Sequence, residues 1–242
     1  MLKKVLIIGS GSIGSKYFNI LKKQRSLMVR RYDINNRRSE FSNFNNCLSW
    51  KPDYAIISTK NDQHIPYLNK LINKIKLTRI LVEKPLAISL REINKIENNI
   101  NFKKNKKKIF VSCNMRFHPA IKKIKKFIKG TKDKIFYSEI FWCYRFDKNK
   151  KKINHFSEEK KGGGVIYDLW HEIDLLTYFF GKIDKTDVYK YTFEKKINKL
   201  NKILIKHNSG ILSFVTGDYL RALKERGMKI IFKNSTLEWR SF

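Results

Sequence analysis

The chain has 242 residues, enough to bury a sizeable core in one or two domains. Its 53 Lys and Arg residues against 21 Asp and Glu residues give a formal net charge of +32. Lys outnumbers Arg 41 to 12, although Arg binds phosphates and base edges with better geometry, and the sequence has neither an aromatic–basic RNA motif nor a helix-turn-helix pattern. We therefore expect a solvated basic surface that favours anionic small molecules on encounter, and no nucleic-acid partner.

The cysteines and the apolar runs indicate the compartment. Cys47, Cys113 and Cys143 are odd in number and lack C-x-x-C or zinc-type spacing, which predicts reduced thiols and no metal site. The apolar run at the N-terminus ends at Gly9 and is too short for a signal peptide, and no segment approaches the roughly 20 apolar residues of a membrane span. These features predict a soluble, cytoplasmic protein without a membrane partner.

Short apolar runs alternate with helical spacing in the first half of the chain. The pattern predicts strands at residues 5–8, 27–32, 55–59, 80–82 and 109–113, helices at 13–21, 64–75 and 89–100, and a polar connector after residue 33. Strands that alternate with helices are typical of an α/β fold. We expect residues 1–116 to form a doubly wound parallel sheet of the Rossmann type that binds a dinucleotide.

The pattern changes after about residue 116. Helices are predicted at residues 119–128 and 165–180, and strands at 135–144, 188–193, 203–205, 211–215 and 228–232. Several strands with only one helix among them are typical of an α+β arrangement. We expect residues 117–242 to form a second domain, for substrate binding and oligomerisation, with a mostly antiparallel open sheet.

A glycine pattern, G-x-G-x-x-G, lies between the first predicted strand and the first predicted helix. Gly9 permits the tight turn, Gly11 lets the backbone approach a pyrophosphate, and Gly14 lets helix and strand pack closely. Ser12 and Ile13 open the helix, whose N-terminal N–H groups can bind the anion. In this context the pattern predicts a dinucleotide site.

Asp33 follows the second predicted strand, nineteen residues after Gly14. Its carboxylate can accept hydrogen bonds from the adenosine ribose hydroxyls and would repel a 2′-phosphate, which favours NAD. Arg37 and Arg38 are close enough in sequence to bind such a phosphate, so NADP stays open as the alternative cofactor. A simple turn role for Asp33 is the other alternative.

Polar segments follow two further predicted strands, at the edge where open α/β sheets bind ligands. The first carries Thr59, Asn61 and His64, and the second carries Glu83 and Lys84. We expect all five residues to contribute to the cofactor site. For His64 the alternative is an ordinary position in the first turn of a helix.

Lys84 is also the candidate acid or base. A lysine amine beside a nicotinamide can take the proton of a substrate hydroxyl while the carbon gives up hydride. Pro85 fixes the backbone after it and can form a cis bond that aims the amine. Among 41 lysines, an ordinary surface position is the alternative.

Three glycines at residues 162–164 precede the predicted helix that carries Asp168 and His171. A spacing of three places both side chains on one helix face, where a carboxylate can orient an imidazole. We expect Asp168 to orient His171, and His171 to hydrogen-bond the reacting hydroxyl or share its proton with Lys84. A capped helix with a structurally satisfied histidine is the alternative.

Together these motifs resemble the Gfo/Idh/MocA family of sugar oxidoreductases. The resemblance runs from residue 2 to about residue 239 and rests on residues 9–14, 59–64, 83–85, 114–119 and 162–174. It implies Lys84 as the catalytic lysine, with Asp168 and His171 as its partners. The Asp-Leu-x-His-Glu form resembles a subgroup tied to surface-polysaccharide metabolism, which points to a nucleotide-sugar or amino-sugar substrate.

Other residues acquire roles from this resemblance. Asn114 is expected at the cofactor, and Arg116, Tyr167 and Trp170, with His171, in the substrate pocket. Trp170 replaces a small residue and would narrow that pocket. Family members continue for some tens of residues further, so a compact variant or a C-terminal truncation is expected, and homo-oligomerisation through the second sheet is expected if the tail is complete.

The predicted activity is that of an NAD(P)-dependent oxidoreductase of the EC 1.1.1 type. It would transfer hydride between a nicotinamide and a hydroxyl or ketone of a small-molecule sugar or nucleotide-sugar. The alternative is a catalytically silent NAD-binding protein that acts as a regulator or as a subunit.

Overall fold

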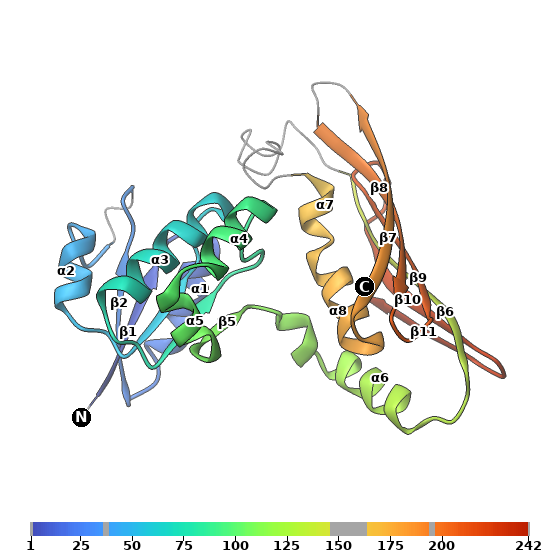
Figure 1. Cartoon of the computed structure of the whole chain (residues 1–242), viewed down its shortest axis with the longest axis horizontal. Coiled ribbons are helices and arrows are strands. Elements are labelled where there is room, and N and C mark those ends of the chain that lie inside the picture. The colour runs from blue at the N-terminus through green and yellow to red at the C-terminus, as the bar shows by residue number, and fades with distance from the viewer. Residues whose placement is uncertain (1, 36–38, 146–163, 194–196, 242) are drawn as a thin grey trace. The chain divides into compact units, whose positions relative to one another are not determined.

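Two compact units make up the chain in the computed structural model (Figure 1). The structure describes residues 2–35, 39–145, 164–193 and 197–241. Unit 1 is Met1–Ser112 and unit 2 is Cys113–Phe242. Within the described ranges, no helix combines the length and the apolar character needed to cross a membrane.

A five-stranded parallel sheet forms the centre of unit 1. Its strands, in the spatial order β2-β1-β3-β4-β5, are β1 (Lys3–Ile8), β2 (Leu27–Tyr32), β3 (Tyr54–Ile57), β4 (Arg79–Val82) and β5 (Ile109–Val111). Side chains on both faces of β1 are buried: Leu6 and Ile8 belong to one apolar cluster, and Val5 and Ile7 to another. Burial on both faces explains the continuous apolar runs of these strands and confirms the predicted doubly wound sheet.

Helices cover both faces of this sheet. They are α1 (Ser12–Leu21), α2 (Phe44–Ser49), α3 (His64–Lys74), α4 (Leu90–Glu97) and α5 (Ile100–Asn105), with 3₁₀ turns at Asn61–Gln63 and Lys106–Lys108. Side chains of α1 pack into the cluster around Val5 and Ile7, whereas side chains of α2 to α5 pack into the cluster around Leu6 and Ile8.

Two helix predictions in unit 1 need correction. The polar connector contains α2, which begins where the Asn43 side chain accepts a hydrogen bond from the N–H of Asn46 and which buries Cys47 completely. The helix predicted at residues 89–100 ends at Glu97, because Asn99 caps a separate helix, α5. Asparagine competes for backbone N–H groups in this way and so favours caps over helix interiors.

A six-stranded sheet forms unit 2, in the spatial order β11-β10-β6-β9-β8-β7. The strands are β6 (Ile135–Cys143), β7 (Ile183–Phe193), β8 (Ile197–His207), β9 (Leu212–Asp218), β10 (Glu225–Phe232) and β11 (Thr236–Ser241). All neighbours are antiparallel except β6 and β9, which are parallel. This confirms the predicted mostly antiparallel sheet, although several strands are longer than their apolar stretches indicated.

Helices cover one face of that sheet (Figure 1). They are α6 (Pro119–Gly130), α7 (Val165–Asp168) and α8 (Trp170–Phe180), preceded by a 3₁₀ turn at Asn114–Phe117. The single helix predicted at residues 165–180 is wrong, since the helix is interrupted at Leu169. The Leu169 side chain is fully buried against Gly217 of β9, where a Cβ atom would lie 2.6 Å from Leu169 Cδ1, so tertiary packing overrides helical continuity here.

Candidate functional site

The glycine turn between β1 and α1 uses its three glycines for three different reasons. Gly9 has φ +96°, and a Cβ atom there would lie 2.7 Å from the carbonyl oxygen of Ser58. A Cβ atom on Gly14 would lie 1.8 Å from the carbonyl oxygen of Gly9, which close packing forbids. A Cβ atom on Gly11 would meet nothing within 4 Å. The space beside Gly11 is therefore open to a ligand that approaches the backbone.

The N-terminus of α1 begins at this open position. No side chain caps the helix, and its first turn holds no acidic residue. The first backbone bond of this turn runs from the N–H of Ser15 to the carbonyl oxygen of Gly11, over 2.9 Å. The N–H groups of Ser12, Ile13 and Gly14 have no acceptor within the helix and form the positive end of its dipole, a natural anion site.

Asp33 lies directly after β2, beside the glycine turn. Its Oδ2 accepts a hydrogen bond from the N–H of Ser10 over 2.6 Å, and its Oδ1 accepts one from the N–H of Asn35 over 2.9 Å. Because each carboxylate oxygen can accept more than one hydrogen bond, acceptor capacity for ribose hydroxyls remains. Arg37 and Arg38, the candidates for a 2′-phosphate, lie outside the described residues.

Glu83 is linked to α1 by Tyr17, a residue that sequence reasoning missed. The Tyr17 hydroxyl donates to Glu83 Oε1 over 2.6 Å and lies 3.2 Å from Ser112 Oγ. Burial, reinforced by Glu83, raises the pKa of Tyr17 to about 12, so its hydroxyl stays protonated and donates at neutral pH. Helical spacing marks Tyr17 only as part of the apolar face of α1, and no sequence signal pairs it with Glu83.

His64 is fully buried beneath two loops of the same sheet edge. Its Nδ1 lies 2.7 Å from the carbonyl oxygen of Pro85, and its Nε2 lies 3.2 Å from the carbonyl oxygen of Thr59. Burial lowers the pKa of His64, which favours the neutral ring with one N–H. This position favours a supporting role for the loops after β3 and β4 over the direct cofactor contact that we expected.

Lys84 follows β4 at the carboxyl edge of the sheet, on the same side as the glycine turn. Its side chain is half-buried, and within the described ranges its Nζ makes no hydrogen bond or ion pair. The Lys84–Pro85 peptide bond is cis. Thr59 and Asn61 follow β3 at this edge, so the structure gathers the unit 1 candidates around the ends of β1, β3 and β4.

In unit 2, the Asp168 carboxylate receives two tyrosine hydroxyls, from residues that we did not identify in the sequence. Asp168 Oδ2 accepts from the Tyr144 hydroxyl over 2.9 Å and from the Tyr219 hydroxyl over 2.7 Å. The two rings meet edge to face with centroids 5.0 Å apart. Asp168 ends α7 and His171 belongs to α8, so the two residues lie on either side of the break at Leu169.

Arg116 forms a two-point ion pair with Asp174 of α8. Its Nε and Nη2 lie 2.9 and 2.5 Å from the two carboxylate oxygens of Asp174, which is buried. The guanidinium also lies 5.1 Å from the ring centroid of Tyr178. This bidentate pair raises the pKa of Arg116 and holds the 3₁₀ turn at Asn114–Phe117 against α8. The side chain expected to bind substrate thus also has a structural task.

The remaining unit 2 candidates surround the break between α7 and α8. Tyr167, Trp170 and His171 are all half-buried there. Glu172, next to His171, is almost fully buried and pairs with Arg226 of β10 over 2.8 Å. This ion pair anchors the start of α8 to the sheet.

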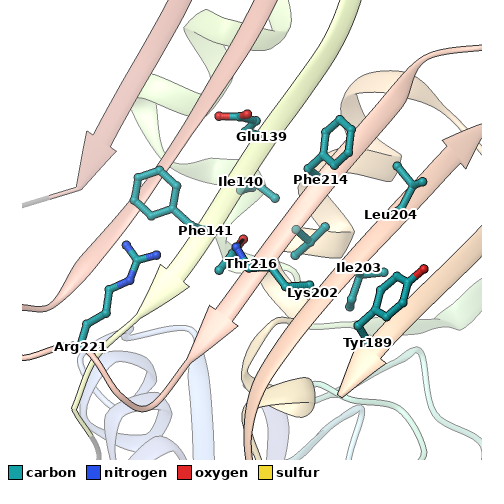
Figure 2. Close-up of a pocket in the computed structure, with 11 residues that line it drawn as sticks. Glu139, Ile140, Phe141, Tyr189, Lys202, Ile203, Leu204, Phe214, Thr216 and Arg221 are labelled. Atoms are coloured by element: carbon teal, nitrogen blue, oxygen red, sulfur yellow. Dashed lines mark hydrogen bonds between the residues drawn. The ribbon is translucent and has the colours of Figure 1, made fainter. Parts of the chain in front are cut away.

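A hollow of about 510 Å³ lies on the other face of the unit 2 sheet (Figure 2). Its lining comes from β6, β7, β8 and β9, with Glu139, Phe141, Lys202 and Phe214 among the residues, and from Arg221 in the connection after β9. None of the residues that we selected from the sequence lines it. The hollow is therefore separate from the segment around Asp168.

Comparisons with known proteins agree with this architecture. Residues 3–112 match the family model GFO_IDH_MocA, which is described as "Oxidoreductase family, NAD-binding Rossmann fold". The matched segment coincides with almost all of unit 1. No curated protein matches the chain significantly.

Solved structures show the same fold over both units. The WlbA dehydrogenase of Chromobacterium violaceum, solved with NADH and UDP-GlcNAcA, has a TM-score of 0.86 and 17% identity, over 98% of this chain and 73% of that one. Myo-inositol 2-dehydrogenase of Lactobacillus plantarum has a TM-score of 0.81 and 17% identity, over 99% of this chain and 76% of that one. UDP-N-acetylglucosamine 3-dehydrogenase of Acidithiobacillus ferrooxidans has a TM-score of 0.79 and 16% identity, over 99% of this chain and 74% of that one. At these identities the likeness establishes the fold.

Proposed function

We propose that this chain is an NAD-dependent oxidoreductase of the Gfo/Idh/MocA family that acts on a hydroxyl or ketone of a sugar or nucleotide-sugar. The observation that carries the proposal is the glycine turn, where open space at Gly11 faces an uncapped helix N-terminus and lies beside the Asp33 carboxylate. The family match over residues 3–112 supports the same assignment.

The residues of unit 1 fit a dinucleotide. The N–H groups of Ser12 and Ile13 would bind the pyrophosphate, and Gly11 would allow its approach. Asp33 would accept hydrogen bonds from the adenosine ribose and disfavour a 2′-phosphate, so NAD is preferred to NADP. When bound, the nicotinamide ring supplies the acceptor or donor of hydride.

Lys84 is the proposed acid or base of the reaction. Its amine is without an ion pair among the described residues and lies at the sheet edge that binds ligands in open α/β folds. In the oxidation direction Lys84 takes the proton of the substrate hydroxyl, and in the reduction direction it returns a proton to the alkoxide oxygen. His171 is the proposed hydrogen-bonding partner of that oxygen, with Asp168 as a supporting carboxylate.

A nucleotide-sugar is the proposed substrate class. One of the similar structures is named as a UDP-N-acetylglucosamine 3-dehydrogenase, and the WlbA dehydrogenase was solved with UDP-GlcNAcA. The net charge of +32 favours the encounter with an anionic diphosphate. Tyr167, Trp170 and the exposed part of Arg116 are the proposed contacts to the sugar.

Self-association through the face of the unit 2 sheet that no described helix covers is part of the proposal. The face carries large apolar side chains that are exposed: Tyr189 to 72%, Leu212 to 37% and Phe214 to 45%. A sheet face that exposes several large apolar side chains is typical of a protein–protein interface.

Nucleotide binding and turnover test the proposed function together. Purified chain is titrated calorimetrically with NAD and with NADP, and dehydrogenation of UDP-N-acetylhexosamines, UDP-hexuronates, free hexoses and inositols is followed by NADH absorbance. We expect NAD to bind at least about tenfold more tightly than NADP, and at least one UDP-sugar to be oxidised. If the chain binds neither NAD nor NADP, the result would contradict the proposal. Tight NAD binding without turnover of any compound would favour the silent regulatory protein instead.

A further inference from the structure

Tyr144 and Tyr219 come to lie together because two strands run in parallel. In the parallel pairing of β6 with β9, the last paired residues are Cys143 and Asp218. The residues that follow them, Tyr144 and Tyr219, therefore leave the sheet side by side. The N–H of Tyr144 also donates to the carbonyl oxygen of Asp218 over 2.9 Å, which holds the two exits in register. The only parallel pair in the described part of this sheet thus places two phenols side by side.

Asp168 is the shared acceptor of both phenols. The hydroxyls of Tyr144 and Tyr219 converge on one oxygen, Oδ2, whereas Oδ1 accepts no hydrogen bond from a described residue. Two donors on the same oxygen fix the position and the plane of the carboxylate, and they leave the lone pairs of Oδ1 available.

The surroundings make this arrangement rigid. Tyr219 is 4% exposed, and its ring packs edge to face on the ring of Tyr144, so the packing around it holds its hydroxyl in place. Leu169, the residue after Asp168, is locked against Gly217 of the same strand that delivers Tyr219. The break between α7 and α8 is therefore tied to β9 at two adjacent residues.

We propose that Tyr144 and Tyr219 are positioning residues of the reaction. They hold Asp168 in one orientation, so that Oδ1 stays available as a hydrogen-bond acceptor for the reacting group or its partner, His171. This assignment rests on the proposed oxidoreductase function, in which Asp168 supports the chemistry, and it adds two residues from strand ends to the site.

The phenols donate hydrogen bonds without giving up their protons. Burial, followed by the charge of Asp168, raises the pKa of Tyr144 and of Tyr219 above the ordinary tyrosine value. Their loss should consequently lower the rate over the whole neutral range and add no new ionisation to the pH profile.

Phenylalanine variants remove the hydroxyls and keep the rings. Tyr144→Phe and Tyr219→Phe are each expected to lower kcat about tenfold, and the double variant roughly a hundredfold, because a misplaced carboxylate weakens the reacting geometry. The dissociation constant of NAD should stay within about twofold, since the dinucleotide residues belong to unit 1. In a background of Asp168→Asn, the tyrosine changes should cause no further loss, because the shared acceptor is already altered.

The control is Tyr137→Phe, another hydroxyl removal on β6, at a residue whose hydroxyl has no hydrogen bond to a described residue. It should leave kcat and the pH profile unchanged, and thermal unfolding verifies that every variant folds. Unchanged kcat in a folded Tyr144→Phe/Tyr219→Phe double variant would overturn the positioning role while the activity of the parent chain stands. If the parent chain binds NAD and converts no substrate, the proposed function itself is wrong and the assignment is lost with it.

Discussion

Lys84 differs from a surface lysine in its position. Its side chain is half-buried, directly follows a central strand, and is without an ion pair among the described residues. A surface lysine would gain little from such a position, because its ammonium group is best solvated when exposed. The placement suits the proposed proton-transferring amine, since it lies at the sheet edge where open α/β folds bind ligands and no carboxylate of a described residue pairs with it.

Replacement of Lys84 is the residue-scale prediction. Lys84→Ala should lower kcat by roughly 10²- to 10⁴-fold, the usual contribution of an acid or base, with the dissociation constant of NAD nearly unchanged. Steady-state kinetics on the best UDP-sugar and calorimetry measure the two quantities. Lys74→Ala, which removes an exposed lysine at the end of α3, is the matched control and should keep full activity. Equal turnover by both variants would contradict the role of Lys84.

At the scale of elements, α1 connects two parts of the candidate site. Its N-terminus points its free N–H groups toward the open space at Gly11. One turn later, the Tyr17 hydroxyl binds Glu83, the neighbour of Lys84. The same helix thus forms the proposed anion site and, through Tyr17, contacts the loop that carries the proposed catalytic amine.

Two glycine substitutions at the start of α1 should separate binding from stability. Gly11→Val places a side chain in open space and should weaken NAD binding at least about tenfold, with little change in the unfolding free energy. Gly14→Ala drives a Cβ atom into the carbonyl oxygen of Gly9 and should lower the unfolding free energy by about 1–3 kcal/mol. Calorimetry with NAD and urea unfolding measure both effects. Normal NAD affinity in Gly11→Val would argue against pyrophosphate binding at this turn.

The elements also show where sequence patterns are reliable. Long amphipathic segments such as α3 and the apolar central strands were predicted nearly in full, since their periodicity is repeated over several turns or residues. The six-residue helix α2 was missed because one buried side chain, Cys47, gives no period. The break at Leu169 was missed because its cause is Gly217, a residue of another element.

For the molecule as a whole, buried histidines in both units predict acid sensitivity. His64 and His207 are completely buried, and burial lowers the pKa of each below the ordinary value of about 6.5. Below that pH the unfolded chain binds protons that the folded chain does not, so stability falls as the pH decreases. Each histidine should contribute a slope of up to about 1.4 kcal/mol per pH unit.

Urea unfolding at a series of pH values from about 7.5 to 5 measures this dependence. Replacement of His207 by Gln removes one titrating group while keeping a donor and an acceptor near Ser213, and it should reduce the slope. A stability that is constant across this range, or that rises toward acid, would show that burial does not lower the pKa values of the two rings in the folded chain.

The uncovered sheet face of unit 2 predicts self-association. Phe214→Lys places a charge among the exposed apolar side chains of this face and should shift the chain toward monomer in sedimentation experiments at micromolar concentration. Phe110→Lys in unit 1 is the matched control, because Phe110 is 46% exposed and Phe214 is 45% exposed. An identical sedimentation profile for the parent and both variants would exclude this face as the interface.

The sequence alone determined the features that depend on residues close together in the chain. The glycine pattern, Asp33, Lys84 and the alternation of strands and helices are recognisable because each depends on neighbours in the chain or on a repeated period. The parallel sheet and the candidate dinucleotide site followed from these local signals.

Only the tertiary structure decided which side chains form hydrogen bonds with one another. Tyr17 meets Glu83 across 66 residues, and Tyr144 and Tyr219 meet Asp168 across 24 and 51 residues. No period or spacing in the chain relates such partners, because their contact depends on how strands are ordered and which of them run in parallel. The same physical reason explains why the sequence did not reveal the two phenols that donate to Asp168.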